Sequence, residues 1–469
     1  MRLHFILWVS LVSSSLSAHS AWAIDSFAWT TNGPRISWTD ASSNQVYTVQ
    51  VSTSLANGTW RNATTRYRWP WPFAHWGDVP RKASGVQFYR VVSHPATTPE
   101  RGKLLTSSLK AQYTLSELVK AFSTDGLEII QRPKFGATAR SFQYETIDPY
   151  GIPILASALL MYPRGTNGPV PLASVQHGTK ALKSEAPSQS RGGFSWAVAL
   201  ASQGYAVVVP DYLGLGSSPG YQAYLHAKSE ATCVVDALRA GRVLCASNNV
   251  LLNGKLFLAG YSQGGHVTMA AHRELETFHA DEFTVTACAP SAGAYDLGGV
   301  MIESIIANPT YTGGPFFAMM LASYLPIYQL GDTLEELLAE PSRSALPATL
   351  DGTHDLEPMM AAMPADCIGI LRADFQADFR TNVSNPLRRA LLENNTYAWT
   401  PKAPTKLFHC RGDEIVPIAN AEVAYQSFTN RGACCVSVMD PGAPESLNHE
   451  QCLYPNLREV IAWFQTFPQ

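Results

Sequence analysis

From about residue 105 onwards, short apolar runs alternate with longer stretches of helix-forming residues. An uninterrupted apolar run of this kind is typical of a strand buried on both faces. Strands of this type separated by helices predict an α/β fold with a largely parallel sheet. The pattern predicts strands at residues 154–161, 172–176, 206–209, 255–259, 283–289, 406–410 and 435–439. It predicts helices that include residues 195–203, 228–244, 266–279 and 457–467.

The alternation stops between about residues 295 and 400. This segment has the composition of helices and is apolar in places, for example at residues 316–321. Because it follows the predicted strand 283–289, it lies where an insertion can cover a pocket. We expect a helical lid or cap here. A lid that moves and a cap with a purely structural role both fit the pattern.

Residues 24–98 follow a different pattern, with short strand-like runs separated by turn residues. This spacing predicts a small all-β sandwich of the fibronectin-III or immunoglobulin type, followed by a linker at 95–100. The segment carries six tryptophans, which are Trp29, Trp38, Trp60, Trp69, Trp71 and Trp76. Packing in and around a small core accounts for most of them. The alternative is an aromatic platform at residues 69–76 that binds a polymer or a cell surface.

The first 23 residues have the features of an export signal. Arg2 supplies a positive start, an apolar stretch covers residues 5–16, and Ala21 and Ala23 form a small-residue cleavage site. We therefore expect a secreted or periplasmic protein that begins near Ile24. A membrane anchor is the less favoured alternative, because serines interrupt a short apolar run. We expect no stable membrane span in the rest of the chain.

Composition narrows the class of protein further. Of the 469 residues, 46% are hydrophobic and 15% are charged, which is typical of a globular protein. The net charge of -3 gives no electrostatic basis for binding nucleic acid. Eight cysteines in an exported chain can form disulfides, and their spacing does not match a zinc site. We expect no metal ion.

The most specific chemical signal is a Gly-x-Ser-x-Gly motif centred on Ser262, directly after the predicted strand 255–259. This arrangement predicts a nucleophile elbow, a sharp turn between a strand and a helix. Gly260 and Gly264 fit because a Cβ at either position would collide with the neighbouring strand or helix. The turn presents the Ser262 hydroxyl as a nucleophile and the Gln263 N–H as half of an oxyanion hole. A glycine-rich turn with an incidental serine is the alternative that this context disfavours.

A serine nucleophile needs a base to accept its proton and an acid to orient that base. In this architecture the order along the chain is serine, acid, histidine. Asp413 follows the predicted strand 406–410, where the acid belongs, and we assign it that role. His449 precedes the final predicted helix and is assigned as the base, since it is the only histidine after His409.

Other acidic residues and histidines are less favoured for these roles. Glu414 is the neighbouring alternative for the acid, and Asp296 and Asp440 rank lower. His266 and His272 lie on the predicted helix after the serine. We expect these two histidines either to support the site from behind or to lie on the surface.

The second oxyanion donor should come from the loop after an early strand. Gly178 allows the backbone to turn there, and we assign the donor N–H to Thr179 or its neighbours. The segment 211–216 ends the next strand, and we expect it to shape the pocket. Its glycines do not match a dinucleotide-binding motif, because the third glycine is one position too late at Gly220.

Taken together, four segments resemble the secretory lipase and esterase group of the α/β hydrolases. They are residues 176–179, 211–216 and 260–266 and the tail that carries Asp413 and His449. The resemblance covers about residues 105–469 and implies an α/β-hydrolase fold, a helical cap and carboxylic-ester hydrolysis. It also implies a disulfide between Cys410 and Cys452, because similar bacterial esterases carry cysteines just before the acid loop and just after the catalytic histidine. The pairing of the other six cysteines stays open.

The sequence therefore predicts a secreted serine carboxylic-ester hydrolase that forms an acyl-enzyme at Ser262 and needs no cofactor. One alternative is a serine peptidase of the same fold. Another is a feruloyl- or polyester-type esterase that residues 24–98 target to a polymer. A third is a catalytically inactive binding protein, which the ordered set of Ser262, Asp413 and His449 disfavours. The acyl and alcohol preference is not predicted.

Overall fold

The structure is a computed structural model, and it describes most of the chain. The described residues are 24–30, 33–38, 45–55, 61–62, 75–77, 88–95, 101–124, 130–151, 153–190 and 195–468. The export signal predicted for residues 1–23 and the aromatic run at 69–73 lie outside the described residues. Among the described residues, no helix is both long enough and apolar enough to cross a membrane.

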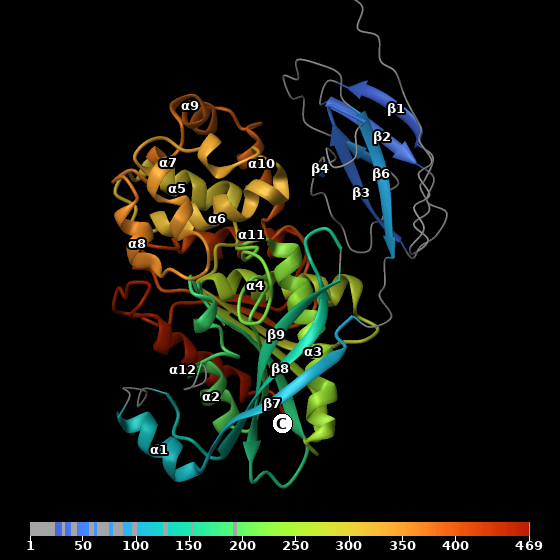
Figure 1. Ribbon diagram of the computed structural model, residues 1–469. Coiled ribbons are helices and arrows are strands. Elements are labelled where there is room, and N and C mark those ends of the chain that lie inside the picture. Colours follow the sequence, from blue (N-terminus) through green and yellow to red (C-terminus); the bar gives the residue numbers. More distant parts are fainter. Residues whose placement is uncertain are drawn as a thin grey trace, which may run out of the picture.

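The centre of the molecule is a nine-stranded sheet with the order β15-β14-β13-β12-β10-β11-β9-β8-β7 (Figure 1). Its strands are β7 (Leu104–Tyr113), β8 (Gly136–Ile147), β9 (Pro153–Arg164), β10 (Val170–Gln176), β11 (Ala206–Pro210), β12 (Leu252–Tyr261), β13 (Val285–Ser291), β14 (Thr405–Phe408) and β15 (Val436–Met439). All seven predicted strands are present. The α/β-hydrolase fold is confirmed.

The prediction of a largely parallel sheet holds for six of the nine strands, and the sheet as a whole is mixed. Strands β10 to β15 run parallel to one another, whereas β7, β8 and β9 form an antiparallel part at one side of the sheet. The pattern of apolar residues did not predict β7 or β8. Most side chains of β7 are exposed and many are polar, so this edge strand lacks the apolar run of a strand buried on both faces.

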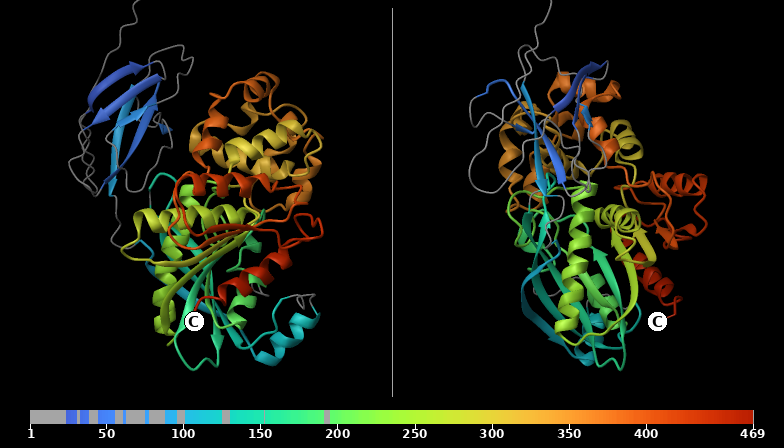
Figure 2. Two further views of the ribbon diagram at one scale, coloured as in Figure 1. Left: turned by 180° about the vertical axis from the view of Figure 1, so that it is seen from behind. Right: turned by 90° about the vertical axis from the view of Figure 1, so that its right-hand side faces the viewer.

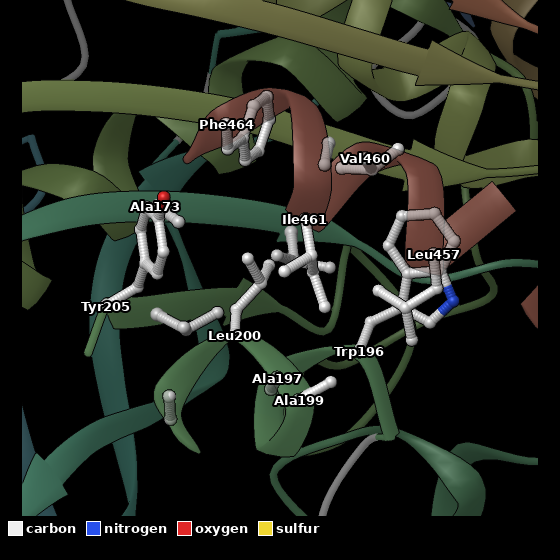
Figure 3. Close-up of a cluster of buried hydrophobic side chains, with 14 of the residues drawn as sticks. Ala173, Trp196, Ala197, Ala199, Leu200, Tyr205, Leu457, Val460, Ile461 and Phe464 are labelled. Carbon is white, nitrogen blue, oxygen red and sulfur yellow. The ribbon is translucent and has the colours of Figure 1, made fainter. Parts of the chain in front are cut away.

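Helices cover both faces of the sheet (Figures 1 and 2). Neighbouring residues of β10 point to opposite faces, as the alternation of side chains along a strand requires. Ala173 packs with helices α2 (Ser195–Ser202) and α12 (Leu453–Phe464), while Leu172 packs with α3 (Ala227–Ser247) and α4 (Gln263–Phe278). Figure 3 shows the first of these clusters, where side chains of α2 and α12 meet. Two further helices are α1 (Leu115–Thr124) and α11 (Ala419–Asn430).

The insertion between β13 and β14 is helical, and its buried apolar side chains form one cluster with a few residues outside the insertion, such as Tyr224 and Val416. It begins with a π-helical turn at Leu297–Met301. The helices that follow are α5 (Ile302–Ala307), α6 (Gly314–Tyr328), α7 (Ser342–Ala345), α8 (Leu356–Ala361), α9 (Ala373–Thr381) and α10 (Pro386–Glu393). Figures 1 and 2 show them gathered together, in yellow to orange, at one end of the sheet. We refer to residues 297–393 as the cap.

The N-terminal segment forms two small antiparallel sheets. One contains β1 (Ile24–Thr30), β2 (Gly33–Trp38) and β5 (His75–Gly77), and the other contains β4 (Arg61–Asn62), β3 (Gln45–Ser52) and β6 (Phe88–Pro95). Described apolar side chains such as Val49, Val51 and Val91 are buried. The described part of this segment is thus all-β, and the fibronectin-III or immunoglobulin type stays a prediction.

The disulfide between Cys410 and Cys452 is confirmed, with Cα atoms 6.2 Å apart. Both cysteines are fully buried and belong to the same apolar cluster as Phe408 and Leu457. The six cysteines whose pairing the sequence left open are free thiols. The four buried thiols are Cys233, Cys245, Cys288 and Cys367. The two exposed thiols are Cys434 and Cys435.

Candidate active site

The serine of the Gly-x-Ser-x-Gly motif lies on a sharp turn between β12 and α4. Its backbone has φ 62° and ψ -122°, a conformation that non-glycine residues rarely adopt. A hydrogen bond of 3.0 Å from the Ser262 N–H to the Ser291 carbonyl oxygen holds the turn. A Cβ at Gly260 would collide with the backbone of Gly264, and one at Gly264 would collide with the carbonyl of Gln176. The close approach of these backbones explains why both flanking positions are glycine.

The structure brings Ser262, His449 and Asp413 into one line. Nε2 of His449 lies 2.9 Å from Oγ of Ser262. Nδ1 of His449 lies 2.7 Å from Oδ2 of Asp413. The alternative acid, Glu414, instead accepts a hydrogen bond of 3.1 Å from the backbone N–H of His449. The ring of His449 therefore has Asp413 as its carboxylate partner.

Asp413 is well placed to stay ionised, although its side chain is buried. Its Oδ1 accepts hydrogen bonds from the backbone N–H groups of Ile415 and Val416, at 3.1 and 2.7 Å. Burial raises the pKa of Asp413, but hydrogen bonds and charge interactions with His409 and His449 outweigh it, so the pKa falls to about 2. A carboxylate with this pKa can hold the His449 ring across the whole neutral pH range.

Replacing Asp413 with asparagine should flatten the pH dependence of the unfolding free energy in acid. The folded carboxyl has a pKa of about 2, against about 3.9 for an unfolded aspartate. The carboxylate therefore contributes about 2 to 3 kcal/mol above about pH 4, and this contribution is lost as the pH falls through about 2. Chemical unfolding of wild type and Asp413→Asn between neutral and acidic pH measures this difference. The exposed Asp281, changed to asparagine, is the control. Equal acid dependence of all three proteins would contradict the prediction.

The predicted oxyanion residues lie beside the serine. Gln263 is the first residue of α4. A Cβ at Gly178 would lie 3.4 Å from the Tyr261 carbonyl oxygen and 3.7 Å from Cβ of Ser262, so this loop touches the elbow. The hydroxyl of Thr179 is hydrogen-bonded to the Tyr224 hydroxyl at 2.8 Å. The Thr179 side chain is thus engaged elsewhere, and its backbone N–H is the group that can serve an oxyanion.

A buried histidine supports the loop that carries Gly178. The ring of His177 stacks on Tyr212 with centroids 4.2 Å apart, and Nδ1 lies 2.7 Å from the Gly178 carbonyl oxygen. Burial lowers the pKa of His177 to about 4, so the ring is neutral at physiological pH. The hydroxyl of Tyr212 donates to the His177 carbonyl oxygen at 3.0 Å. The expectation that residues 211–216 shape the pocket is corrected, since they lie behind this loop and outside the pocket lining.

A pocket opens at Ser262, and its walls are mainly apolar. The cap supplies much of the lining. The lining residues are Thr179, Tyr224, Leu225, Ser262, Gln263, Ala294, Leu297, Met301, Ile302, Ile305, Tyr311, Gly313, Phe316, Phe317, Met320, Leu391, Ile415 and Val416. None of these described lining residues carries a charged side chain. The pocket can therefore hold an apolar group next to the serine.

The other candidates lie apart from the His449 ring. Asp296 accepts hydrogen bonds from the side chain of Asn395 and the backbone of Val300, and Asp440 lies near Arg411. His266 and His272 are fully buried, which makes a surface location wrong for both. His266 contacts a buried carboxylate behind the elbow. Across the described part of the chain, no cluster of three histidine, cysteine or acidic side chains is arranged to hold a metal ion.

Two residues that support the site were not predicted from the sequence. His409 is buried at the end of β14, and its Nε2 lies 3.5 Å from Oδ2 of Asp413. Glu230, on α3, is hydrogen-bonded to the side chain of Gln263 at 2.8 Å. The position of His409, four residues before Asp413, could have indicated that it lies near the acid. The sequence gives no sign that Glu230 is buried, because a glutamate in a helical pattern is usually exposed.

Comparison with known proteins identifies relatives of this chain. The sequence profile of the secretory lipase family matches residues 194–465. The rice cell wall degrading esterase LipA of Xanthomonas oryzae is similar in structure, with a TM-score of 0.73 and 32% sequence identity. That similarity covers 78% of this chain and 99% of the esterase.

More distant relatives include fungal lipases. Lipase 4 and Lipase 5 of Candida albicans are 23% and 24% identical over 239 and 247 residues. The chain spans about half the length of these curated relatives. Candida antarctica lipase A in its closed state has a TM-score of 0.59 at 18% identity, covering 79% of this chain and 84% of that one. At this identity the last comparison concerns the fold alone.

Proposed function

The chain belongs to the secretory lipase family of the α/β hydrolases, and on this premise we propose that it is a serine carboxylic-ester hydrolase with Ser262 as its nucleophile. The observation that carries the proposal is the position of His449. Its ring lies within hydrogen-bond distance of both Ser262 and Asp413, at 2.9 and 2.7 Å. A serine held in this way next to an apolar pocket suits attack on an ester whose acyl group enters the pocket.

In the proposed reaction, Oγ of Ser262 attacks the ester carbonyl while Nε2 of His449 accepts the hydroxyl proton. Asp413 keeps the other ring proton on Nδ1 and stabilises the imidazolium that forms. The backbone N–H groups of Gln263 and Thr179 stabilise the oxyanion of the tetrahedral intermediate. His449 then protonates the leaving alcohol, which leaves an acyl-enzyme. Water, activated by the same histidine, releases the acid.

The apolar pocket supports an acyl chain as the group that the enzyme recognises. Each methylene that leaves water contributes about 0.8 kcal/mol, equivalent to about fourfold in kcat/KM. A series of p-nitrophenyl esters from acetate to palmitate should therefore show kcat/KM rising with chain length until the pocket is full. A folded wild-type protein that hydrolyses none of these esters would contradict the proposed function.

Met320→Trp should move the preferred acyl length to shorter esters. Met320 lines the pocket and is 4% exposed, so a larger side chain takes up space that a long acyl chain needs. We expect kcat/KM for the longest good substrates to fall about 10-fold, with little change for acetate. Met360→Trp is a matched control, because Met360 also lies in the cap but is 57% exposed. An equal effect of the two substitutions would show that Met320 does not contact the acyl chain.

The pocket also bears on the peptidase alternative. A peptidase of this fold would need an acidic or a hydrophobic subsite for a peptide terminus, and the described lining contains no acidic side chain. An anilide analogue of the best ester should therefore be a much poorer substrate. Comparable turnover of the two compounds would favour the peptidase.

We further propose that residues 24–98 form an accessory domain, separate from a catalytic domain at about 105–469 whose lid spans about 295–400. The similar Xanthomonas esterase is described as degrading rice cell walls, and it matches nearly all of its own length but 78% of this chain. A polymeric ester is thus a candidate substrate, with residues 24–98 attaching the enzyme to it. Deleting them should abolish attachment to an insoluble ester and spare hydrolysis of a soluble one. Unchanged attachment would refute this role.

Membership of a secretory family supports export of the protein. We propose that residues 1–23 are the cleaved signal. N-terminal sequencing of protein recovered from the medium or periplasm should then begin near Ile24. A product that still carries residues 1–23 would contradict cleavage at this site.

A further inference from the structure

A buried carboxylate lies directly behind the nucleophile elbow. Glu230, in the first turns of α3, is 1% exposed. Its Oε1 accepts hydrogen bonds from the side-chain amide of Gln263 at 2.8 Å and from the backbone N–H of Leu225 at 3.1 Å. Its Oε2 lies 3.1 Å from Nδ1 of His266. Both carboxylate oxygens therefore bind the first turn of α4, since Gln263 and His266 are three residues apart on one side of that helix.

His266 links this carboxylate to the cap. Its ring is fully buried, and Nε2 lies 3.0 Å from the backbone carbonyl oxygen of Asn394, which follows α10. Both ring nitrogens thus face oxygen acceptors, and only an N–H can bond to an acceptor. Beside an ionised Glu230 carboxylate, His266 satisfies both contacts only as an imidazolium that carries two N–H groups. The Glu230 carboxylate supplies the opposite charge that a buried imidazolium requires.

Asn394 extends the contacts from the elbow to two further parts of the fold. Its side-chain oxygen accepts a hydrogen bond of 2.8 Å from the backbone N–H of Ala227, at the start of α3. Its side-chain nitrogen donates to the hydroxyl of Tyr328, in the cap, at 2.6 Å. The nearby His226 stays neutral, because burial and the charge of His266 lower its pKa to about 3. One buried network of hydrogen bonds thus joins the elbow, α3 and the cap around Glu230 and His266.

We propose that Glu230 and His266 form a buried ion pair that positions Gln263 for oxyanion stabilisation and ties this position to the seating of the cap. This inference rests on the proposed ester hydrolysis for its kinetic consequences. Glu230 is a positioning residue, since it acts through Gln263. The Gln263 N–H must point to where charge develops in the transition state, so displacing it lowers kcat more than it raises KM.

The kinetic test compares two isosteric substitutions of buried glutamates that both join α3 to α4. Glu230→Gln removes the charge beside Gln263 and His266. Glu274→Gln removes the charge of the buried carboxylate that pairs with Lys228 at 2.5 Å and does not contact Gln263. We expect Glu230→Gln to lower kcat for the best p-nitrophenyl ester by about 10-fold with KM changed less than about threefold. Glu274→Gln should leave kcat within about twofold of wild type, even where it lowers stability.

A double-mutant cycle tests whether Glu230 acts through Gln263. Gln263→Met removes the side-chain amide and keeps the backbone N–H. If the two residues act as one unit, the double variant loses little more kcat than Glu230→Gln alone. Additive losses would overturn the proposal. Equal kcat in Glu230→Gln and Glu274→Gln, or a rise in KM at unchanged kcat, would also overturn it.

The ion pair itself can be tested without any ester. In protein labelled with ¹⁵N-histidine, NMR should show two slowly exchanging ring N–H groups for His266, assigned by their loss in His266→Gln. Glu230→Gln should lose one of them, and Glu274→Gln should keep both. A wild-type His266 with a single ring N–H would refute the ion pair. Failure of the proposed function, by contrast, would appear as a wild type that hydrolyses no ester and keeps both signals.

Discussion

Ser262→Ala is expected to lower kcat/KM for p-nitrophenyl esters by about 10⁵-fold, leaving only a small residual rate. The loss follows from the geometry, because Oγ of Ser262 is the atom that Nε2 of His449 approaches to 2.9 Å. Without this atom no acyl-enzyme forms, although the pocket and the oxyanion groups still bind the ester. KM should therefore change much less than kcat. Steady-state kinetics on the best ester of the chain-length series measures both constants.

Two comparisons make this result specific. Ser323→Ala changes the same atoms in the cap, where the buried hydroxyl has no hydrogen-bond partner among the described residues, and it should keep full activity. His449→Ala should be about as inactive as Ser262→Ala, and the double variant should be no worse, because the residues act as one unit. Activity retained in a folded Ser262→Ala protein would exclude this serine as the nucleophile.

The sequence predicted the elbow well because several local signals agree there. An apolar strand, two glycines forced by close backbones and a helix without proline or glycine after Gly265 all lie within one short segment. The acid and the base followed from their order along the chain and from their places after β14 and before α12. The order of residues along the chain and their positions relative to strands and helices can be read directly from the sequence.

The sheet was predicted less completely, for a physical reason. β8 and β9 pair over their full lengths, and β7 pairs with β8, which makes an antiparallel part at one side of the sheet. An antiparallel edge strand exposes much of its surface, so β7 carries many polar residues. Its sequence therefore resembles that of a loop. Strand pairing depends on contacts between distant segments, and a single sequence does not show those contacts.

The residues that support the site could not be predicted either, because their burial also depends on contacts between distant segments. Glu230 is buried because α3 packs on α4, and nothing near it in the sequence signals that packing. The pocket-facing residues of the cap were equally hard to predict. The helix Gly314–Tyr328 is apolar on most sides, so periodicity does not distinguish the side that faces Ser262 from the side in the cap core.

The disulfide between Cys410 and Cys452 should be a major contribution to stability. It closes a loop with a sequence separation of 42 residues. Closing a loop of this length restricts the unfolded chain by about 4 kcal/mol in the chain-entropy account. Cys410→Ala/Cys452→Ala should lower the free energy of unfolding by about this amount, measured by denaturant titration. Cys288→Ala, which removes a buried free thiol, is the control and should cost only about 1 kcal/mol.

The same disulfide should also matter for catalysis, because of where its ends lie. Cys410 is three residues before Asp413, and Cys452 is three residues after His449. The bond therefore ties together the two loops whose side chains meet at 2.7 Å. Without it, the acid and base loops can drift apart, and we expect kcat to fall about 10-fold even where the double variant is fully folded. A folded double variant with wild-type kcat would show that packing alone keeps the loops in register.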